Sequence, residues 1–510
     1  MQGSYNDAGR FIPSHISGYG KTRPFHYEDE YSPHIQHRVP TRDKVPCSVT
    51  DLPEAISLSG LKDGMRISFH HHLRLGDLVV GLVLEQLEEL GFRDLVLCAS
   101  SLMGPACASV LRAVQAKVVA RIETTGLKEP LTDAVLQGEI PQPVIFRSHG
   151  GRARAIEAGE IPIDVAFLAA SAIDVQGNLY GCTGKNPFGS MGYAHPDAQY
   201  AKTVIAITDT RVEGQSLPIS IPSKWVDLIV EVPAIGDARL IGGGSLRISQ
   251  NPLELVIATQ ALGVLQASGM IRDGFNYQAG SGGISLLVSM LLNSHMQAHH
   301  IQGGFASGGI TESLVAMAQN KLFHTLYDVQ SFDTGSAASL AGNPFHKEMG
   351  ASQYANPYHP GCIAHALDVM ILSATEVDLD FHVNSITGTN GRILGALGGG
   401  PDTAYGAKLT VVVIPSFRGR IPMIHEHVNL VCTPGGSVDV VVTERGVAVN
   451  PLRPDILALL QASSLPVVPI RTLMEQIYML TGRPHFPART AKVVAAVEYR
   501  DGTIIDCLWR

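Results

Sequence analysis

Short apolar runs alternate with amphipathic segments along most of the chain. Residues 66–73 have the pattern of a strand, residues 77–89 that of a helix that ends before Gly91, and residues 94–100 that of another strand. The runs at 118–122, 143–149, 164–171 and 203–209 are typical of strands that are buried on both faces. This order predicts an α/β fold with parallel strands.

A second series of the same kind begins near Asn251 with a helical pattern over 253–269. Further strand-like runs follow at 274–280, 300–306, 326–332, 369–377, 409–415, 428–432 and 438–444. Near the end, Asp501-Gly502 lies between two apolar runs, which is a strong hairpin signal. We therefore expect an extended N-terminal arm over 1–46 and two α/β domains, 47–250 and 251–510.

The charge and the cysteine pattern exclude several classes of protein. The net charge is -8, the pI is near 6.2, and no dense Lys/Arg run is present, so nucleic acid is not an expected partner. No apolar stretch approaches the roughly 20 residues that span a bilayer, and the start lacks a signal-peptide core. The seven cysteines are scattered without metal-ligand spacing. We expect reduced thiols, a cytoplasmic location and neither a metal site nor a membrane partner.

Two glycine-rich turns are the first candidates for chemistry. One comprises Gly280, Ser281, Gly282 and Gly283, and the other extends from Gly395 to Gly400. Glycine permits positive φ and close backbone approach, so such turns present N–H groups to an oxyanion or to a phosphate. A tight connection without function is the alternative for each turn.

Three histidines follow one another at His70, His71 and His72. Successive strand residues point to opposite faces, so the three rings cannot converge on one metal ion. We expect instead that an imidazole lies at the carboxyl end of the strand, where α/β sheets bind ligands, or that the rings pack. Ser148 and His149 likewise end a strand and open a helix, where an anion or a simple turn is expected.

The remaining candidates are single charged side chains. Arg418 and Arg420 follow a strong strand and have the planar donors that grip carboxylates, and Lys185 lies in a polar loop after Cys182. A solvated surface position is the alternative for each. The glutamates with the positions of acyl-carrying nucleophiles are Glu312, Glu376 and Glu444.

The chain resembles the alpha subunits of citrate lyase from about Asp51 to its end. The segments that carry the resemblance are ISFHHHLRLGD, SHGGR, IDVAFLAAS, YGCTGKN, LYDVQSFD, ASQYANP, VNSITGTNGRILGALGGGPDTA, RGRIP and TPGGSVDVVVTERGVAVNP. We place Asn384 with Gly398, Gly399 and Gly400 in the predicted catalytic set. Substrate-binding roles are predicted for His70, His71, Ser148, His149, Arg418 and Arg420, and thioester-carrier roles for Gly280 to Gly283 and Lys185.

The resemblance implies two related α/β domains of the coenzyme A transferase type with the active site in the cleft between them. In that superfamily a glutamate carries the acyl group, but glycines stand in the corresponding stretch, Phe305 to Ile310. The implied reaction is therefore direct attack: a citrate carboxylate strikes the acetyl thioester, and the released thiolate attacks the citryl carbonyl of the mixed anhydride. Positioning and backbone donors would carry the catalysis.

The implied thioester carrier is acetyl-CoA or the phosphoribosyl-dephospho-CoA arm of an acyl carrier protein. The implied partners are the citrate lyase beta subunit and the gamma acyl carrier protein, with this chain as a homo-oligomer in a larger complex. Two alternatives stay open: an acetate-type CoA-transferase or acyl-CoA hydrolase that uses a glutamate, and a non-catalytic ligand-binding module of the same fold.

Overall fold

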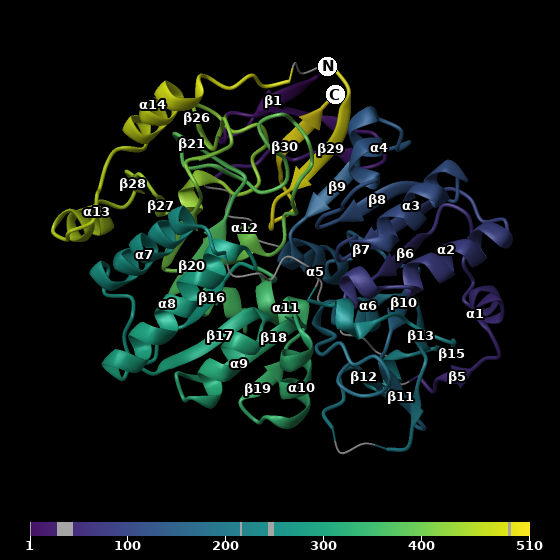
Figure 1. The fold of residues 1–510 in the computed structure, drawn as a ribbon. Coiled ribbons are helices and arrows are strands. Elements are labelled where there is room, and N and C mark those ends of the chain that lie inside the picture. The colour runs from purple at the N-terminus through teal and green to yellow at the C-terminus, as the bar shows by residue number, and fades with distance from the viewer. Residues whose placement is uncertain (1, 28–43, 215–216, 243–248, 488–490) are drawn as a thin grey trace.

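The structure, a computed structural model, describes residues 2–27, 44–214, 217–242, 249–487 and 491–510. Within these residues, two large sheets organise the chain, one in each half (Figure 1). The first, in spatial order, contains β30 (Ile504–Trp509), β29 (Val493–Glu498), β9 (Val144–Arg147), β8 (Val119–Thr124), β7 (Leu95–Ala99), β6 (Arg66–Phe69), β10 (Val165–Ala169), β13 (Thr203–Thr208), β15 (Leu228–Glu231) and β5 (Cys47–Ser48). The second contains β19 (His346–Glu348), β18 (Phe323–Ser331), β17 (Gly303–Ile310), β16 (Tyr277–Ala279), β20 (Val369–Ser373), β23 (Leu409–Val413), β27 (Val440–Thr443) and β28 (Gly446–Val449).

Helices follow most of the strands, as the alternating pattern predicts. In the first half they are α1 (Leu52–Leu58), α2 (Val79–Glu89), α3 (Pro105–Gln115), α4 (Leu131–Gln137), α5 (His149–Glu157) and α6 (His195–Tyr200). In the second half they are α7 (Pro252–Ala267), α8 (Gly283–His299), α9 (Glu312–Gln319), α10 (Thr334–Gly342), α11 (Ala351–Ala355), α12 (Gly400–Gly406), α13 (Pro454–Gln461) and α14 (Ile470–Thr481). Within the two large sheets, the strand pairs are parallel except at β27–β28 and β29–β30, which confirms the predicted α/β class.

Smaller strand groups extend the loops at the ends of the two sheets. They are β1 (Gly3–Tyr5) with β2 (Phe11–Pro13), β3 (His15–Ile16) with β4 (Gly20–Lys21), β11 (Ala172–Asp174) with β12 (Leu179–Tyr180) and β14 (Arg211–Val212), β21 (Glu376–Asp378) with β22 (Val383–Asn384) and β26 (Ile424–His425), and β24 (Phe417–Arg418) with β25 (Ile421–Pro422). No helix within the described ranges is both long and apolar enough to cross a bilayer.

The strands β20, β23 and β27 of the second sheet are apolar on both faces. In β20, Val369 and Ile371 pack into the core cluster that includes α7, α8 and α9, while Met370 and Leu372 pack with α14 on the opposite face. The side chains alternate because successive strand residues point to opposite sides. This double burial explains why the predicted strands appear as continuous apolar runs rather than alternating ones.

The C-terminal hairpin joins the first sheet rather than the second, although it follows the second half in sequence. β29 pairs in parallel with β9, with Ala495 opposite Val144, and Figure 1 shows the yellow hairpin against the blue strands. The two predicted hairpin strands are confirmed, and Gly502 in their turn has φ +91°. Buried ion pairs of Arg147 with Glu498 fix the hairpin to the sheet. Residues 493–509 therefore follow the second half in sequence but belong to the sheet of the first half.

The described part of the N-terminal arm, residues 2–27, covers this hairpin. The Phe25 amide donates to the Ile504 carbonyl at 3.1 Å, and the Asn6 side-chain amide donates to the Ile505 carbonyl at 2.8 Å. Ile12 is buried in a cluster with residues of β9, β29 and β30. Residues 28–43 of the predicted arm lie outside the described residues.

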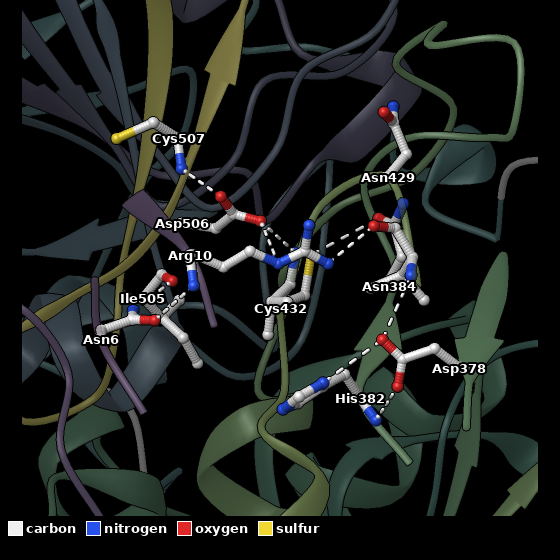
Figure 2. A network of polar contacts seen from close by, with 12 residues as sticks. Asn6, Arg10, Asp378, His382, Asn384, Asn429, Cys432, Ile505, Asp506 and Cys507 are labelled. Carbon is white, nitrogen blue, oxygen red and sulfur yellow. Dashed lines mark hydrogen bonds and ion pairs between the residues drawn. The ribbon is translucent and has the colours of Figure 1, made fainter. Parts of the chain in front are cut away.

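The apolar run 428–432 is buried but forms no strand, so this prediction was wrong. Its backbone N–H groups bind carboxylates instead: Val428 donates to Asp378, Asn429 to Glu376 and Val431 to Asp506. Figure 2 shows part of this network, in which Arg10 donates to the Val428 carbonyl at 2.7 Å and pairs with Asp506. Donors already held by buried carboxylates are not available to a β-ladder.

Candidate functional site

A cleft of about 430 Å³ opens where the carboxyl ends of strands from both halves meet. Its lining includes His71, Thr125 and His149 from the first half and the two predicted glycine turns from the second. This volume lies within the usual range of small-molecule sites, roughly 300–1,000 Å³. The cleft is therefore the candidate active site.

The turn before α12 forms one wall of the cleft and is tied to the first half through its backbone. The Leu397 amide donates to the Thr125 carbonyl at 2.9 Å, and the His149 amide donates to the Gly398 carbonyl at 3.0 Å. Gly398 has φ +62°, a left-handed conformation that favours glycine. Gly399 and Gly400 also line the cleft, at the start of α12. The predicted catalytic glycines are thus held together at the junction of the halves.

Asp402 fastens this turn to helix α5. Its carboxylate accepts from the Ser148 hydroxyl at 2.8 Å and from the Gly150 amide at 2.9 Å, and Arg500 from the hairpin turn lies 3.7 Å away. Burial raises the pKa of Asp402 to about 6, against the opposing effect of Arg500. Ser148, which we predicted to bind substrate, is therefore occupied by an internal carboxylate at the start of α5 and does not line the cleft.

Two neutral imidazoles face the cleft. The rings of His71 and His149 are nearly parallel with centroids 5.8 Å apart, and Tyr193 stacks on His149 at 4.1 Å. Burial lowers the pKa of His149 to about 3, and burial together with the neighbouring His149 holds the pKa of His71 well below its usual value. His71 Nδ1 lies 2.7 Å from the Ser100 hydroxyl. Both predicted residues are in place as uncharged hydrogen-bonding groups.

His70 points away from the cleft. Its Nε2 lies 3.1 Å from Asp197, which Arg152 also binds in a bidentate pair at 2.7 and 2.8 Å. Arg152, with His70, depresses the pKa of Asp197 despite its burial. The three histidines follow β6, and His71 turns to the side opposite to His70 and His72, as the alternation predicts. The predicted substrate-binding role of His70 is not supported by this position.

The second glycine turn connects β16 to α8. Gly280, Ser281 and Gly282 line the cleft, whereas Gly283 is the first residue of α8 and lies just behind them. The Gly280 amide donates to the Ile371 carbonyl at 2.9 Å, so it is already engaged. The 17-residue helix directs its positive end towards the cleft.

Other predicted residues lie outside the cleft. Asn384 is fully buried and binds Glu376 and Thr387, so it supports the turn that carries Ser385 at the cleft wall. Arg418 and Arg420 belong to the exposed β24–β25 hairpin. The Lys185 ammonium donates to the Asp209 carbonyl at 2.9 Å. The expected direct contacts of these side chains with substrate or carrier have no support in their positions.

Several lining residues were missed from the sequence. Arg74 and Lys128 are the cations of the first half, and Tyr354, Gln278 and Gln330 are polar residues of the second. Arg74 lies in the same quoted segment as the histidines, five residues after the end of β6. The Tyr354 hydroxyl accepts from the Gln278 side-chain amide at 2.7 Å. For Gln330, near the end of β18, the position at a strand end was the available signal, whereas Tyr354 lies in α11 and had none.

Among the described residues, no Asp or Glu lines the cleft. Glu376 is buried against Asn384 and the Asn429 amide, Glu444 binds Ser416, and Glu312 is an exposed residue at the start of α9. The stretch in which a superfamily glutamate was expected is β17, and it contributes Gly309 to the wall. A Cβ at Gly309 would lie 2.1 Å from the Phe332 ring, so an aromatic ring fills that space.

One group of side chains in the described residues has the spacing of metal ligands: Asp378, Asp380 and His382, with ligand atoms within 4.8 Å of one another. Figure 2 shows Asp378 bound to His382. The Asp378 carboxylate accepts the backbone amides of Asp380, His382 and Val428, which is the bonding of a structural turn. We assign no metal-binding role to it.

Comparisons with known proteins identify the family of the chain. A family model described as citrate lyase, alpha subunit, matches residues 46–510. The citrate lyase alpha chain of Haemophilus influenzae is 46% identical over 461 residues, covering 90% of this chain and 92% of its own.

Solved structures give the same picture at the level of the fold. A structure from Streptococcus mutans, named as an alpha subunit of citrate lyase in complex with citrate, has a TM-score of 0.93 at 41% identity and 99% coverage of both chains. A Pseudomonas malonate decarboxylase in complex with malonate shares the fold alone, with a TM-score of 0.65 at 15% identity over 87% of this chain and 95% of that one. The extent and the identity of these matches place the chain in the citrate lyase alpha subunit family.

Proposed function

We propose that this chain transfers a thioester carrier from an acetyl group to citrate, giving acetate and a citryl thioester. The carrier is acetyl-CoA or the phosphoribosyl-dephospho-CoA arm of an acyl carrier protein. In the full enzyme the chain acts with a beta subunit and the gamma acyl carrier protein, and several copies assemble in the complex. All seven cysteines are free thiols, which agrees with the reducing cytoplasm as its location.

The observation that carries the mechanism is a cleft between the two halves whose described lining holds glycine turns, imidazoles and cations but no carboxylate. An enzyme that forms an acyl-glutamate needs a glutamate at the reacting carbonyl. Without one, a citrate carboxylate is the nucleophile. It adds to the acetyl carbonyl, the thiolate leaves, and a citryl-acetyl anhydride remains. The thiolate then adds to the citryl carbonyl, and acetate leaves.

The protein's contribution is position and electrostatics. Citrate is already ionised at neutral pH, so no general base is needed for the attack. Gly398, Gly399 and Gly400 present their backbone to the cleft at the positive end of α12, where N–H groups can donate to each tetrahedral oxyanion. His71 and His149 are neutral and donate or accept single hydrogen bonds without adding charge. Gly280 to Gly283, at the start of α8, are suited to anionic groups of the carrier.

The test uses acetyl-CoA with the purified chain. Acetate release should depend on citrate, and mass spectrometry after borohydride or hydroxylamine treatment should find no modified glutamate. A stoichiometric adduct at Glu312, Glu376 or Glu444 would overturn the direct attack and favour the glutamate-dependent transferase. Tight citrate binding without any acetate release would favour a non-catalytic module.

A further inference from the structure

Arg74 is the one arginine among the described residues that line the cleft. It begins a short 3-10 turn, Arg74–Gly76, directly after the histidines, and only 6% of the residue is exposed. Neither of the arginines predicted from the sequence to grip carboxylates reaches this cleft. Arg74 is therefore the arginine of the described lining that can contact a ligand in the cleft.

The turn holds Arg74 in a defined and costly conformation. Arg74 has φ +49°, which is uncommon for a residue with a side chain. Its amide donates to the His71 carbonyl at 3.1 Å, and the Asp237 amide donates to the Gly76 carbonyl at 3.0 Å, which locks the turn from outside. Backbone strain that is fixed by its surroundings in this way concentrates at functional sites.

The guanidinium is oriented across the junction of the two halves. It lies over the Phe332 ring, 4.8 Å from the centroid, and Phe332 directly follows β18 in the second half. The ring itself is packed against Gly309, which leaves it no room to move towards β17. A guanidinium that stacks through its face binds carboxylates through its edge, with two parallel N–H donors.

The charge of the cleft favours an anionic ligand at this edge. Burial lowers the pKa of Arg74, because the cation is removed from water. The neighbouring imidazoles are neutral, and no described Asp or Glu lines the cavity. A carboxylate of the ligand has the charge and the planar geometry that the edge of a guanidinium binds.

We propose that Arg74 binds a non-reacting carboxylate of the tricarboxylate substrate and so positions the attacking carboxylate. This inference rests on the proposed function and specifies the substrate contact within it. Arg74 acts on recognition of citrate and not on recognition of the thioester carrier.

The experiment compares Arg74→Met and Arg74→Lys with the control Arg471→Met, which changes an exposed arginine of α14 outside the cleft. Met keeps an unbranched stem beside Phe332, and Lys keeps the charge but loses the planar fork. The KM for citrate should rise about 10- to 100-fold in Arg74→Met, by less in Arg74→Lys, and not in the control. The KM for acetyl-CoA and the melting temperature should stay near those of the parent chain.

Calorimetric titration with citrate alone separates this inference from the proposed function. If the parent chain binds citrate but releases no acetate, the proposed function fails, while loss of citrate binding in Arg74→Met still supports the contact. An unchanged citrate Kd in folded Arg74→Met overturns the contact, as does a parent chain that binds no citrate. Equal rises in both KM values with a lowered melting temperature would show that Arg74 is only structural.

Discussion

Alanine substitutions in the Gly398–Gly400 turn test the oxyanion assignment, and the structure shows that the three positions are not equivalent. A Cβ at Gly399 would lie 2.4 Å from the Tyr354 hydroxyl and 3.0 Å from two carbons of that ring. Tyr354 is buried and bound to Gln278, so it cannot move without loss. Gly399→Ala should therefore cost about 1–3 kcal/mol of stability through overpacking, and it does not isolate the chemistry.

Gly400→Ala is the more discriminating change. The nearest atom to its Cβ is Leu372 Cδ1 at 3.0 Å, the end of a flexible side chain, and alanine is favoured over glycine in a helix. At Gly398 the added Cβ would meet nothing closer than 3.9 Å, but φ +62° makes alanine about 1 kcal/mol less favourable there. Only Gly400→Ala is expected to leave the fold unchanged while a methyl group enters the cleft wall.

The assay measures kcat for citrate-dependent acetate release at saturating acetyl-CoA, together with the melting temperature. Removal of one oxyanion donor costs about 10²–10³ in kcat, so obstruction by a methyl group should cost about 10- to 100-fold. Gly342→Ala is the matched control, because its Cβ has no neighbour within 4 Å and it lies at the end of α10. If Gly400→Ala folds normally and turns over like this control, the added methyl group does not meet the reacting groups, and the oxyanion assignment loses its support at Gly400.

Two further predictions concern side chains beside this turn. Burial raises the pKa of Asp402 to about 6, above its unfolded value, so the parent chain loses stability as pH rises through this value. The free energy of unfolding of Asp402→Asn should therefore rise relative to that of the parent as the pH increases to about 6, by up to about 3 kcal/mol. Paired thermal melts of the two proteins across this pH range check this, and a difference that does not change with pH would contradict it. Tyr354→Phe should lower kcat, because its hydroxyl lies beside Gly399; Tyr277→Phe, whose hydroxyl binds Ser289 away from the cleft, should not. Equal kcat in both variants would remove Tyr354 from the site.

The sequence predicted the strands and the fold class because burial on both faces leaves a continuous apolar signal. It could not predict that β29 would pair with β9, since apolar periodicity describes a strand's faces and not its neighbour. The same limit explains the run 428–432, whose amides bind Glu376, Asp378 and Asp506. In both examples the structure of the segment depends on hydrogen-bonding partners that are remote in sequence.

Residues of the candidate site were predicted where the sequence indicates the shape of the backbone. They were missed where membership of the site depends on the direction of a side chain. The glycine turns, His71 and His149 line the cleft as expected of residues at strand ends. Arg418 and Arg420 have the right chemistry but lie on an exposed hairpin, because nothing in their spacing reveals which loops reach the junction of the sheets. Arg74 was not predicted as a site residue, although it lies in the same segment as the three histidines.

Two loops with a similar glycine spacing, one from each half, meet at the cleft. Gly189 and Gly192 precede Pro196-Asp197 much as Gly395 and Gly398 precede Pro401-Asp402. Each Pro-Asp pair lies in a short helix before a parallel strand, and each aspartate is buried near an arginine, Arg152 or Arg500.

The residue that follows the second glycine of each loop breaks this symmetry. In the first half it is Tyr193, whose ring stacks on His149 with centroids 4.1 Å apart. In the second half it is Gly399, which lines the cleft and leaves room for the Tyr354 hydroxyl, 2.4 Å from where a Cβ would lie. One loop thus places an aromatic ring beside the imidazole of His149, and the other lines the same junction with glycine backbone. The two loops therefore present different surfaces to the same cleft, and the proposed oxyanion donors belong to the second loop alone.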